Sequence, residues 1–200
     1  YGHVQRRTHR NTSWDMARFE VAAQKYVDLS DQQKGVALLN DCKYGHKLHD
    51  NIIDLHLLRA PTYPDPDADL GNHQFCYVLY PHNSPFQQSD VIEQAQQFNQ
   101  APLSMQGIPI SPIQPPVIVE GADVGLEVLK KAEKDDCLVL RVVERKGRKS
   151  YTTLRLTDSN LKLSSTDLME WNDFGNAVGG ELKLTFKPFE IKTFKITQSS

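Results

Sequence analysis

The sequence has 200 residues, of which 39% are apolar and 24% charged, with a formal net charge of −2. This composition is ordinary for a globular chain of one large or two small domains, and the near-neutral charge argues against nucleic acid or an anionic membrane as a partner. The sequence contains no 18-residue apolar run that would span a membrane and no recognisable leader peptide.

The first sixty residues predict an extended segment followed by strands. Residues 1–15 are polar and rich in turn formers, which indicates a loop. Apolar and polar residues alternate between Arg18 and Leu29 with one slip, the pattern of a half-buried strand with a bulge. The apolar runs Gly35–Leu39 and Ile52–Leu58 flank a polar insert, and we expect them to be two strands joined by a long hairpin loop.

The next stretch predicts a buried strand and a helix. His73–Tyr80 has large side chains on both faces, so we expect a strand covered on both sides and closed by Pro81. In Ser89–Gln100 apolar residues share one stripe, and Asp90 stands where a helix cap is expected. This is the one helix that the pattern predicts, and a lone helix in a mostly β chain is usually a connector.

A proline-rich stretch divides the sequence in two. Residues 101–116 contain five prolines and little charge, as expected of an extended crossing between packed units. We therefore expect a domain over residues 1–100, a linker over 101–116 and a domain over 117–200. The second domain is predicted to be a small antiparallel β-sandwich, with strands at Val117–Glu120, Leu126–Ala132, Cys137–Glu144, Ser150–Leu156, Asn160–Asp167, Glu181–Phe186 and Phe189–Thr197.

The three cysteines indicate a reducing compartment. Cys42, Cys76 and Cys137 are odd in number and widely spaced, which fits free thiols better than a disulfide framework, and we expect a cytoplasmic protein. The chain begins in mid-pattern without methionine, so we expect it to be the C-terminal piece of a longer polypeptide.

Catalytic and metal-binding motifs are not recognisable. His46, His49 and His56 do not share one helical face, and no thiol pair has ligand spacing, so no metal site is predicted within the chain. No strand–elbow nucleophile or phosphate-binding glycine loop is present either. We therefore predict no catalytic residue here.

The segment after Leu58 offers the best candidates for a binding site. Asp65, Asp67 and Asp69 alternate along a proline-rich loop, where they form a solvated turn, line a sugar site or bind calcium. Arg59 directly follows an apolar run, so we expect a rigid strand to position it, and its planar fork suits paired acceptors. A ligand role and a structural ion pair with a nearby aspartate both remain open.

Four stretches of the sequence, taken in order, carry a family resemblance. They are HRNTSWDMARFEV (9–21), GVALLNDCKYG (35–45), LLRAPTYPDPDAD (57–69) and FKPFEIKTFKI (186–196). Together they resemble the C-terminal part of glycoside hydrolase family 38 α-mannosidases of the bacterial and cytosolic type. The chain departs from that pattern at Arg7, where the family often has proline, and at Met16, where it often has tryptophan.

The resemblance implies a fold and an activity. The expected fold is all-β: part of the large galactose-mutarotase-like β-sandwich, one short connecting helix and a small terminal β-sandwich. The implied enzyme is a retaining, exo-acting α-mannosidase with a carboxylate nucleophile and zinc or another divalent cation. Those groups belong to an N-terminal catalytic barrel, so we expect this chain to contain no cofactor and to be inactive alone. Its expected partners are that barrel and an α-mannoside oligosaccharide.

The resemblance also implies substrate-binding residues. Arg59 corresponds to the arginine that the family's sandwich extends toward the mannose site, while Lys43 and Tyr44 lie in the segment facing the barrel. Two other functions remain open. One is a free-standing carbohydrate-binding module with Trp14, Tyr63 or Trp171 as stacking platforms. The other is a purely structural interaction domain. Homo-oligomerisation is left open as well.

Overall fold

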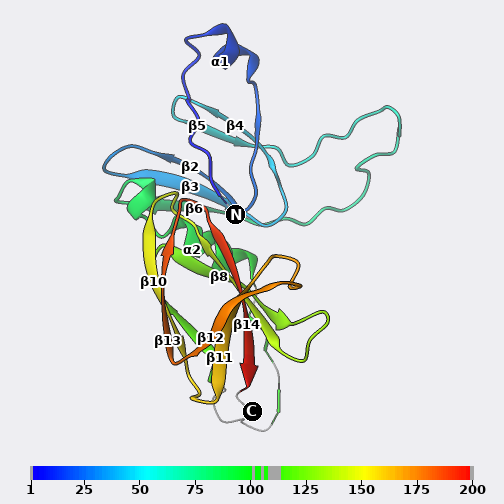
Figure 1. The fold of residues 1–200 in the computed structure, drawn as a ribbon. Coiled ribbons are helices and arrows are strands. Elements are labelled where there is room, and N and C mark those ends of the chain that lie inside the picture. Colours follow the sequence, from blue (N-terminus) through cyan, green and yellow to red (C-terminus); the bar gives the residue numbers. More distant parts are fainter. Residues whose placement is uncertain (1, 101, 105, 108–113, 199–200) are drawn as a thin grey trace. The chain divides into compact units, whose positions relative to one another are not determined.

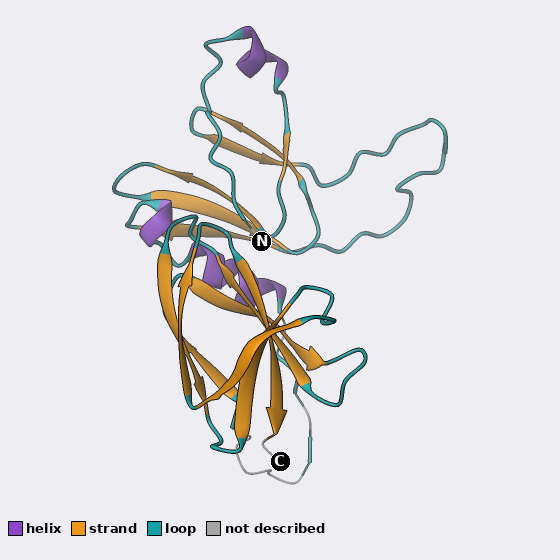
Figure 2. Ribbon diagram, in the orientation of Figure 1, coloured by secondary structure: helices purple, strands orange, loops and turns teal. Residues whose placement is uncertain are grey.

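A computed structural model describes residues 2–100, 102–104, 106–107 and 114–198 (Figure 1). The chain divides into two compact units, Gln5–Gln106 and Gly107–Ser200, and Tyr1–Val4 belongs to the second. The boundary falls inside the proline-rich stretch 101–116, and residues 101, 105 and 108–113 of the expected linker lie outside the described residues. Strands are the main regular structure of both units (Figure 2), so the predicted all-β fold class is confirmed.

The unit Gln5–Gln106 contains two small antiparallel sheets, one in the order β1-β4-β5 and the other in the order β2-β3-β6. Its elements are α1 (Ser13–Ala17), β1 (Val21–Ala22), β2 (Tyr26–Ser30), β3 (Gly35–Asn40), β4 (Gly45–His49), β5 (Ile52–Leu55), β6 (Tyr77–His82), the 3-10 helix η1 (Phe86–Gln88) and α2 (Val91–Asn99).

Helix α2 packs on the sheet β2-β3-β6 and supplies half of this unit's small core. Val91 and Ala95 on the helix are fully buried against Ala37 and Leu39 of β3, and Phe98 is partly buried beside them. The helix and its apolar stripe are therefore confirmed. Asp90 occupies the N-cap position, but its side chain makes no capping hydrogen bond and accepts instead from the Tyr80 hydroxyl and the Gln94 amide.

The unit Gly107–Ser200 is a sandwich of two antiparallel sheets, as predicted. One sheet has the order β13-β10-β7 and the other the order β12-β11-β14-β9-β8. The strands are β7 (Val117–Glu120), β8 (Val124–Lys131), β9 (Leu138–Glu144), β10 (Ser150–Leu156), β11 (Leu161–Thr166), β12 (Asp173–Gly179), β13 (Glu181–Phe186) and β14 (Ile191–Gln198).

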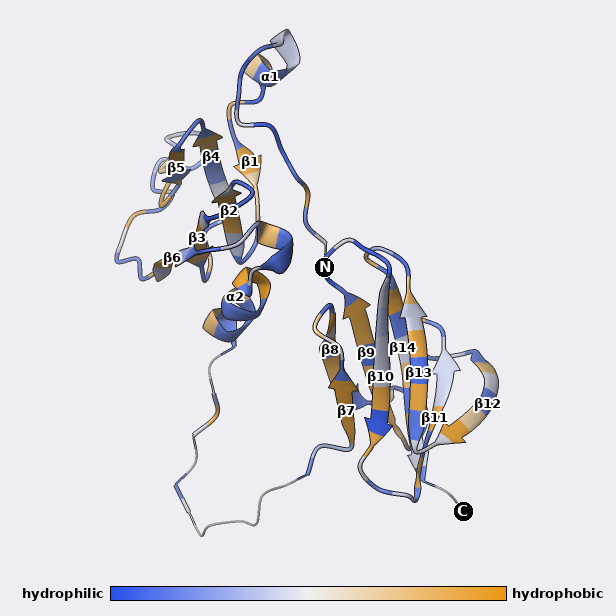
Figure 3. Ribbon diagram, turned by 90° about the vertical axis from the view of Figure 1, so that its left-hand side faces the viewer, coloured by the Kyte–Doolittle hydropathy of each residue, from blue (hydrophilic) through white to orange (hydrophobic). Residues whose placement is uncertain are grey.

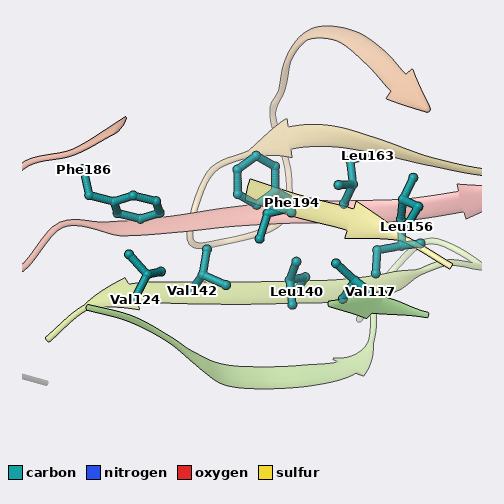
Figure 4. Packing of buried hydrophobic residues seen from close by; sticks show 10 residues of the cluster. Val117, Val124, Leu140, Val142, Leu156, Leu163, Phe186 and Phe194 are labelled. Atoms are coloured by element: carbon teal, nitrogen blue, oxygen red, sulfur yellow. The ribbon is translucent and has the colours of Figure 1, made fainter. Parts of the chain in front are cut away.

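The core of the sandwich lies between its two sheets. Strand β13 alternates hydrophobic with hydrophilic residues, the pattern of a strand with one covered face (Figure 3). In Figure 4, Phe186 and Phe194 lie with Leu140 and Val142 between the strands, and each is at most 1% exposed. Burying a phenylalanine or leucine side chain contributes about 1.5–3 kcal/mol, so these residues dominate the stability of the unit.

The long hairpin predicted between residues 35–39 and 52–58 is wrong. Strand β3 pairs with β2 and β6, whereas β5 pairs with β4 in the other sheet. The polar insert itself contains strand β4, and the real hairpin is β4-β5, whose turn includes Asp50 with a positive φ of 51°. The insert looked like a loop because β4 presents polar residues, of which His46 is nevertheless fully buried.

The strand predicted at His73–Tyr80 is also displaced, and its faces are not both covered. Strand β6 begins at Tyr77, and Tyr77, Val78 and Leu79 are 54%, 37% and 64% exposed. Pro81 does not end the strand but lies within it, opposite Val36. β6 is an edge strand, where a proline can be accommodated because no partner needs its missing N–H group.

Three other expectations change in detail. The strand predicted over residues 18–29 is two strands, β1 and β2, separated by a turn in which Lys25 has a φ of 68°. The predicted loop over residues 1–15 leads into the one-turn helix α1, whose first turn is capped by the Thr12 hydroxyl accepting from the Asp15 N–H. Strand β12 was not predicted, because its exposed residues, from Asp173 to Gly179, show no apolar alternation.

A buried histidine–aspartate contact joins the outer strands of the sheet β2-β3-β6. His82 Nε2 lies 2.7 Å from Asp28 Oδ2, and both side chains are almost fully buried. Gly35 of β3 lies directly against this pair. A Cβ atom at position 35 would be 2.4 Å from Ser30 Cβ and 2.6 Å from the His82 ring, closer than real contacts allow.

Replacing Gly35 by alanine is therefore expected to destabilise this sheet by about 1–3 kcal/mol, the usual cost of overpacking. The added methyl group has to displace His82 and weaken its contact with Asp28. Hydrogen exchange of the β3 amides should accelerate accordingly. Gly107→Ala is the matched control, because its Cβ would meet open space. Equal exchange rates in the two variants would show that the close approach is not rigid.

Candidate functional site

An open pocket of about 630 Å³ lies on the unit Gln5–Gln106, at the end of the segment that leaves strand β5. It is formed by residues from four separate parts of the sequence: Glu20, Lys43, the run His56–Leu57–Leu58–Arg59, and Asp69 with His73. Two of the three substrate-binding residues predicted from the sequence, Arg59 and Lys43, thus share one pocket. The third, Tyr44, is not part of its lining.

Arg59 is not held by a strand, as its sequence context suggested. Strand β5 ends at Leu55, and residues 56–60 have no regular secondary structure. The next residue, Ala60, has a positive φ of 46°, a left-handed conformation that is unfavourable for a residue with a Cβ atom. The Arg59 side chain makes no hydrogen bond or ion pair to another residue within the described part of the chain, so its donors are available for a ligand.

Lys43 is positioned by the turn between β3 and β4. Its backbone N–H donates to Asn40 Oδ1 at 2.9 Å, and its ammonium group lies 5.1 Å from the centre of the Phe75 ring. The face of an aromatic ring attracts a cation but does not occupy all of its N–H donors. Lys43 therefore retains donors for a ligand, as Arg59 does.

Tyr44 contributes mainly through its backbone. Its carbonyl accepts from Ala23 N–H at 3.0 Å and lies 3.2 Å from His46 Nδ1, while its side chain is half exposed. Burial lowers the pKa of His46 below its usual value, despite the opposing effect of the Tyr44 carbonyl. The ring is therefore a neutral structural group beneath the Asn40–Gly45 segment.

Two of the three aspartates of the proline-rich loop have distinct side-chain roles. Asp65 stabilises a turn inside the loop, since its side chain accepts from Asp67 N–H at 3.0 Å. Asp69 instead joins the two ends of the loop, because its Oδ2 accepts from Ala60 N–H at 2.9 Å. Neither arrangement has the ligand geometry of a calcium loop, and the turn is the interpretation that these contacts support.

The pKa of Asp69 is lowered, first by the hydrogen bond from Ala60 and further by the Arg59 backbone and the charges of His73 and Lys43, against the opposing effect of burial. A lowered pKa in the folded state means that this contact is fully present above the unfolded pKa and is lost as the pH falls through the folded one. The loop closure is therefore stable at neutral pH.

Glu20, His56 and His73 complete the pocket but were not predicted from the sequence. His56 Nε2 lies 3.1 Å from Glu20 Oε1, and His73 Nε2 lies 2.8 Å from the Asp69 carbonyl oxygen. These residues come from distant segments, and only the folded chain brings them together. The pocket thus offers donors on Arg59 and Lys43 beside carboxylate acceptors, a mixture suited to a polyhydroxylated ligand.

The described residues include no group of three or more histidine, cysteine, aspartate or glutamate side chains that could hold a metal ion. In the same part of the chain, no helix has the length and apolar character needed to cross a membrane. The three aromatic residues considered as sugar platforms are exposed, but Trp14 lies in α1, Tyr63 in the β5-β6 loop and Trp171 in the β11-β12 loop. One face of Trp171 is occupied by Lys134, whose ammonium lies 4.0 Å from the ring centre.

The fold and this pocket define a two-unit β module with a polar, arginine-bearing surface site. Two family models match the sequence: the glycosyl hydrolases family 38 C-terminal domain over residues 1–67, and the family's C-terminal beta sandwich domain over residues 123–194. The chain therefore belongs to the C-terminal domains of glycosyl hydrolase family 38, which confirms the resemblance seen in the sequence.

Curated relatives agree with this assignment. Alpha-mannosidase 2C1 of Mus musculus is 39% identical over 100% of this chain, that of Homo sapiens is 41% identical over 96%, and alpha-mannosidase G of Dictyostelium discoideum is 37% identical over 98%. The chain covers only 20%, 19% and 19% of these proteins, so it spans about a fifth of the length of the relatives that it matches.

Solved structures show the same fold. An α-mannosidase from Enterococcus faecalis V583 matches with a TM-score of 0.74 and 22% identity, over 97% of this chain and 23% of that one. A second Enterococcus faecalis protein, of glycosyl hydrolase family 38, matches with a TM-score of 0.67 and 20% identity, over 88% of this chain and 22% of its own.

Proposed function

We propose that this chain is the non-catalytic C-terminal β part of a retaining, metal-dependent exo-α-mannosidase, and that it contributes Arg59 to the site that binds the terminal mannose. The observation that carries the proposal is the pocket in which Arg59 and Lys43 present donors without described ion-pair partners. The family assignment supports it, because the relatives are named α-mannosidases and are about five times longer than the chain.

In this proposal the pocket binds the sugar and does not perform the chemistry. The guanidinium group of Arg59 and the ammonium group of Lys43 donate to mannose hydroxyl oxygens, and Glu20 accepts from hydroxyl hydrogens. The described residues do not fit a metal ion. Zinc or another divalent cation, together with the nucleophile, would therefore be held by the catalytic part of the polypeptide.

Exposed apolar side chains support an extensive contact with another part of the same polypeptide. In the unit Gln5–Gln106, helix α1 has no buried residue, and its Trp14 and Met16 are 82% and 54% exposed. Phe19, Tyr77 and Leu79 are likewise more than half exposed. Large exposed apolar groups indicate an interface, and the catalytic barrel of the longer enzyme is the partner that we propose. The three free cysteines fit a cytoplasmic location.

The proposal predicts that the 200-residue chain alone hydrolyses no aryl α-mannoside, whereas the full-length polypeptide that contains it does. The described residues provide sugar-binding donors but no cluster of side chains that could hold a metal ion, and we propose that the nucleophile lies in the catalytic part of the polypeptide. Release of 4-nitrophenol from 4-nitrophenyl α-mannoside measures both. Turnover by the purified chain would contradict the proposal. The alternative function, a free-standing carbohydrate-binding module, is tested by titrating the isolated chain with mannose. That function requires a saturable change in tryptophan fluorescence.

A further inference from the structure

We infer that Asp69 is a positioning residue for Arg59, acting by closing the loop 60–69 so that the guanidinium group is presented to the pocket. This inference rests on the proposed role of Arg59 in binding the mannoside. It assigns Asp69 a function that neither the sequence pattern nor the family assignment gives.

Arg59 needs a support other than a strand. Three residues separate it from the last residue of β5, and the one backbone–backbone hydrogen bond described for this segment is at its start, where His56 N–H donates to the Gly45 carbonyl at 2.9 Å. A long flexible side chain on such a segment would sample many positions and would lose conformational entropy on binding a ligand. Any contact that fixes the backbone at residue 59 or 60 therefore reduces the cost of binding.

Asp69 makes that contact. Its carboxylate accepts the Ala60 N–H at 2.9 Å, and the Arg59 backbone also stabilises its charged form. The Asp69 carbonyl oxygen in turn lies 2.8 Å from His73 Nε2, which extends the support toward the segment that leads into β6. Asp69 thus connects the backbone beside Arg59 to His73, another residue that lines the same pocket.

The backbone conformation shows that this closure is specific. Ala60 and Asp69 both have positive φ angles, 46° and 60°. Such angles are disfavoured for residues other than glycine and persist when surrounding contacts compensate for them. The two strained residues are the two partners of the hydrogen bond, so the bond between them holds the loop ends in a conformation that the chain would not otherwise favour.

The other aspartates provide an internal comparison. Asp65 also accepts a backbone N–H, that of Asp67 at 3.0 Å, but this bond lies entirely inside the loop and does not reach Arg59. A variant at position 65 therefore removes the same type of side chain and the same type of hydrogen bond without touching the support of Arg59. Asp65→Ala is the matched control for Asp69→Ala.

The test uses the full-length polypeptide and steady-state hydrolysis of 4-nitrophenyl α-mannoside. Because a small displacement of a binding group is costly, Asp69→Ala is expected to lower kcat/KM by about tenfold. It should change the same parameter, kcat or KM, as Arg59→Ala. Asp69→Asn tolerates the positive φ and keeps one acceptor, so it should restore most of the activity. Asp65→Ala should have less than about a twofold effect.

A double-mutant cycle separates positioning from general stability. If Asp69 acts through Arg59, then adding Asp69→Ala to Arg59→Ala should cause no further loss. A tenfold further loss in the double variant, or unchanged kcat/KM in Asp69→Ala, would overturn the inference while leaving the role of Arg59 intact. An Arg59→Ala variant with normal kcat/KM would overturn both. The double variant also addresses folding, because an Asp69→Ala change that merely unfolded the chain would cause a further loss in the Arg59→Ala background.

Discussion

Replacing Arg59 by alanine in the full-length polypeptide should lower kcat/KM for an aryl α-mannoside by about tenfold to a hundredfold. A hydrogen bond from a charged donor contributes about 1.5–3 kcal/mol, and each 1.36 kcal/mol corresponds to a factor of ten. The effect should be at the upper end of this range if the guanidinium group donates two hydrogen bonds. Among the described residues that line the pocket, Lys43 is the one other lysine or arginine that could replace it. Steady-state kinetics measure the change.

Two further variants make this result specific. Arg59→Lys keeps the positive charge but loses the planar fork, so it should recover little activity if the contact is bidentate. Lys43→Ala should lower kcat/KM by only a few fold, because an ammonium group placed over the Phe75 ring makes a single-point contact. A loss of activity less than twofold in Arg59→Ala would show that the pocket is not the mannoside site.

The second domain was predictable from the sequence because its strands are short, regular and clearly separated. Strands β7, β10 and β13 begin and end at the predicted residues, and β14 was placed within two residues at its start. Each is a short run between turn residues, and β13 also alternates apolar with polar residues, so the local pattern and the sheet structure agree. Strand β12 was missed for the opposite reason, as all its residues are exposed and its pattern carries no apolar signal.

The first unit was harder because its sheets are made of non-consecutive strands. The apolar runs of β3 and β5 predicted that these two strands pair with each other. In the structure β5 pairs with the intervening strand β4, and β3 belongs to the other sheet. The polar appearance of β4 hid it, since His46 is buried beside Asn40 rather than exposed. The apolar residues of β6 likewise predicted a strand buried on both faces, but several of these residues are exposed in the structure.

The candidate site was predictable only in part. The motif around residues 57–69 identified Arg59, and the segment 40–45 identified Lys43, because both stretches have distinctive family sequences. Their common pocket depends on long-range packing that places Glu20 and His73 beside them. The support that Asp69 gives to Ala60 depends on a side chain folding back over nine residues, which no local pattern specifies.

A different kind of result is expected at Glu144, which is fully buried in the second unit. Its Oε1 accepts Lys146 N–H at 2.8 Å, and its Oε2 accepts Gly147 N–H at 2.9 Å and Phe189 N–H at 2.8 Å. One carboxylate therefore joins the β9-β10 turn to the β13-β14 turn. Gly147 and Phe189 both have positive φ angles, so the turns depend on this shared acceptor.

Glu144→Ala should therefore destabilise the sandwich by about 3–5 kcal/mol, because several N–H groups lose their acceptor in a buried site. Glu144→Gln should cost less but remain harmful, since its amide offers one acceptor oxygen in place of two.

The chain has two tryptophans, Trp14 and Trp171, one in each unit, so a Trp14→Phe background lets urea unfolding monitored by fluorescence report on the sandwich alone. The matched control is Glu181→Gln, which removes a half-exposed ion pair with Arg155 and should change the free energy of unfolding by less than about 1 kcal/mol. Equal unfolding midpoints for the Glu144 and Glu181 variants would mean that the two turns hold their conformations without the buried carboxylate.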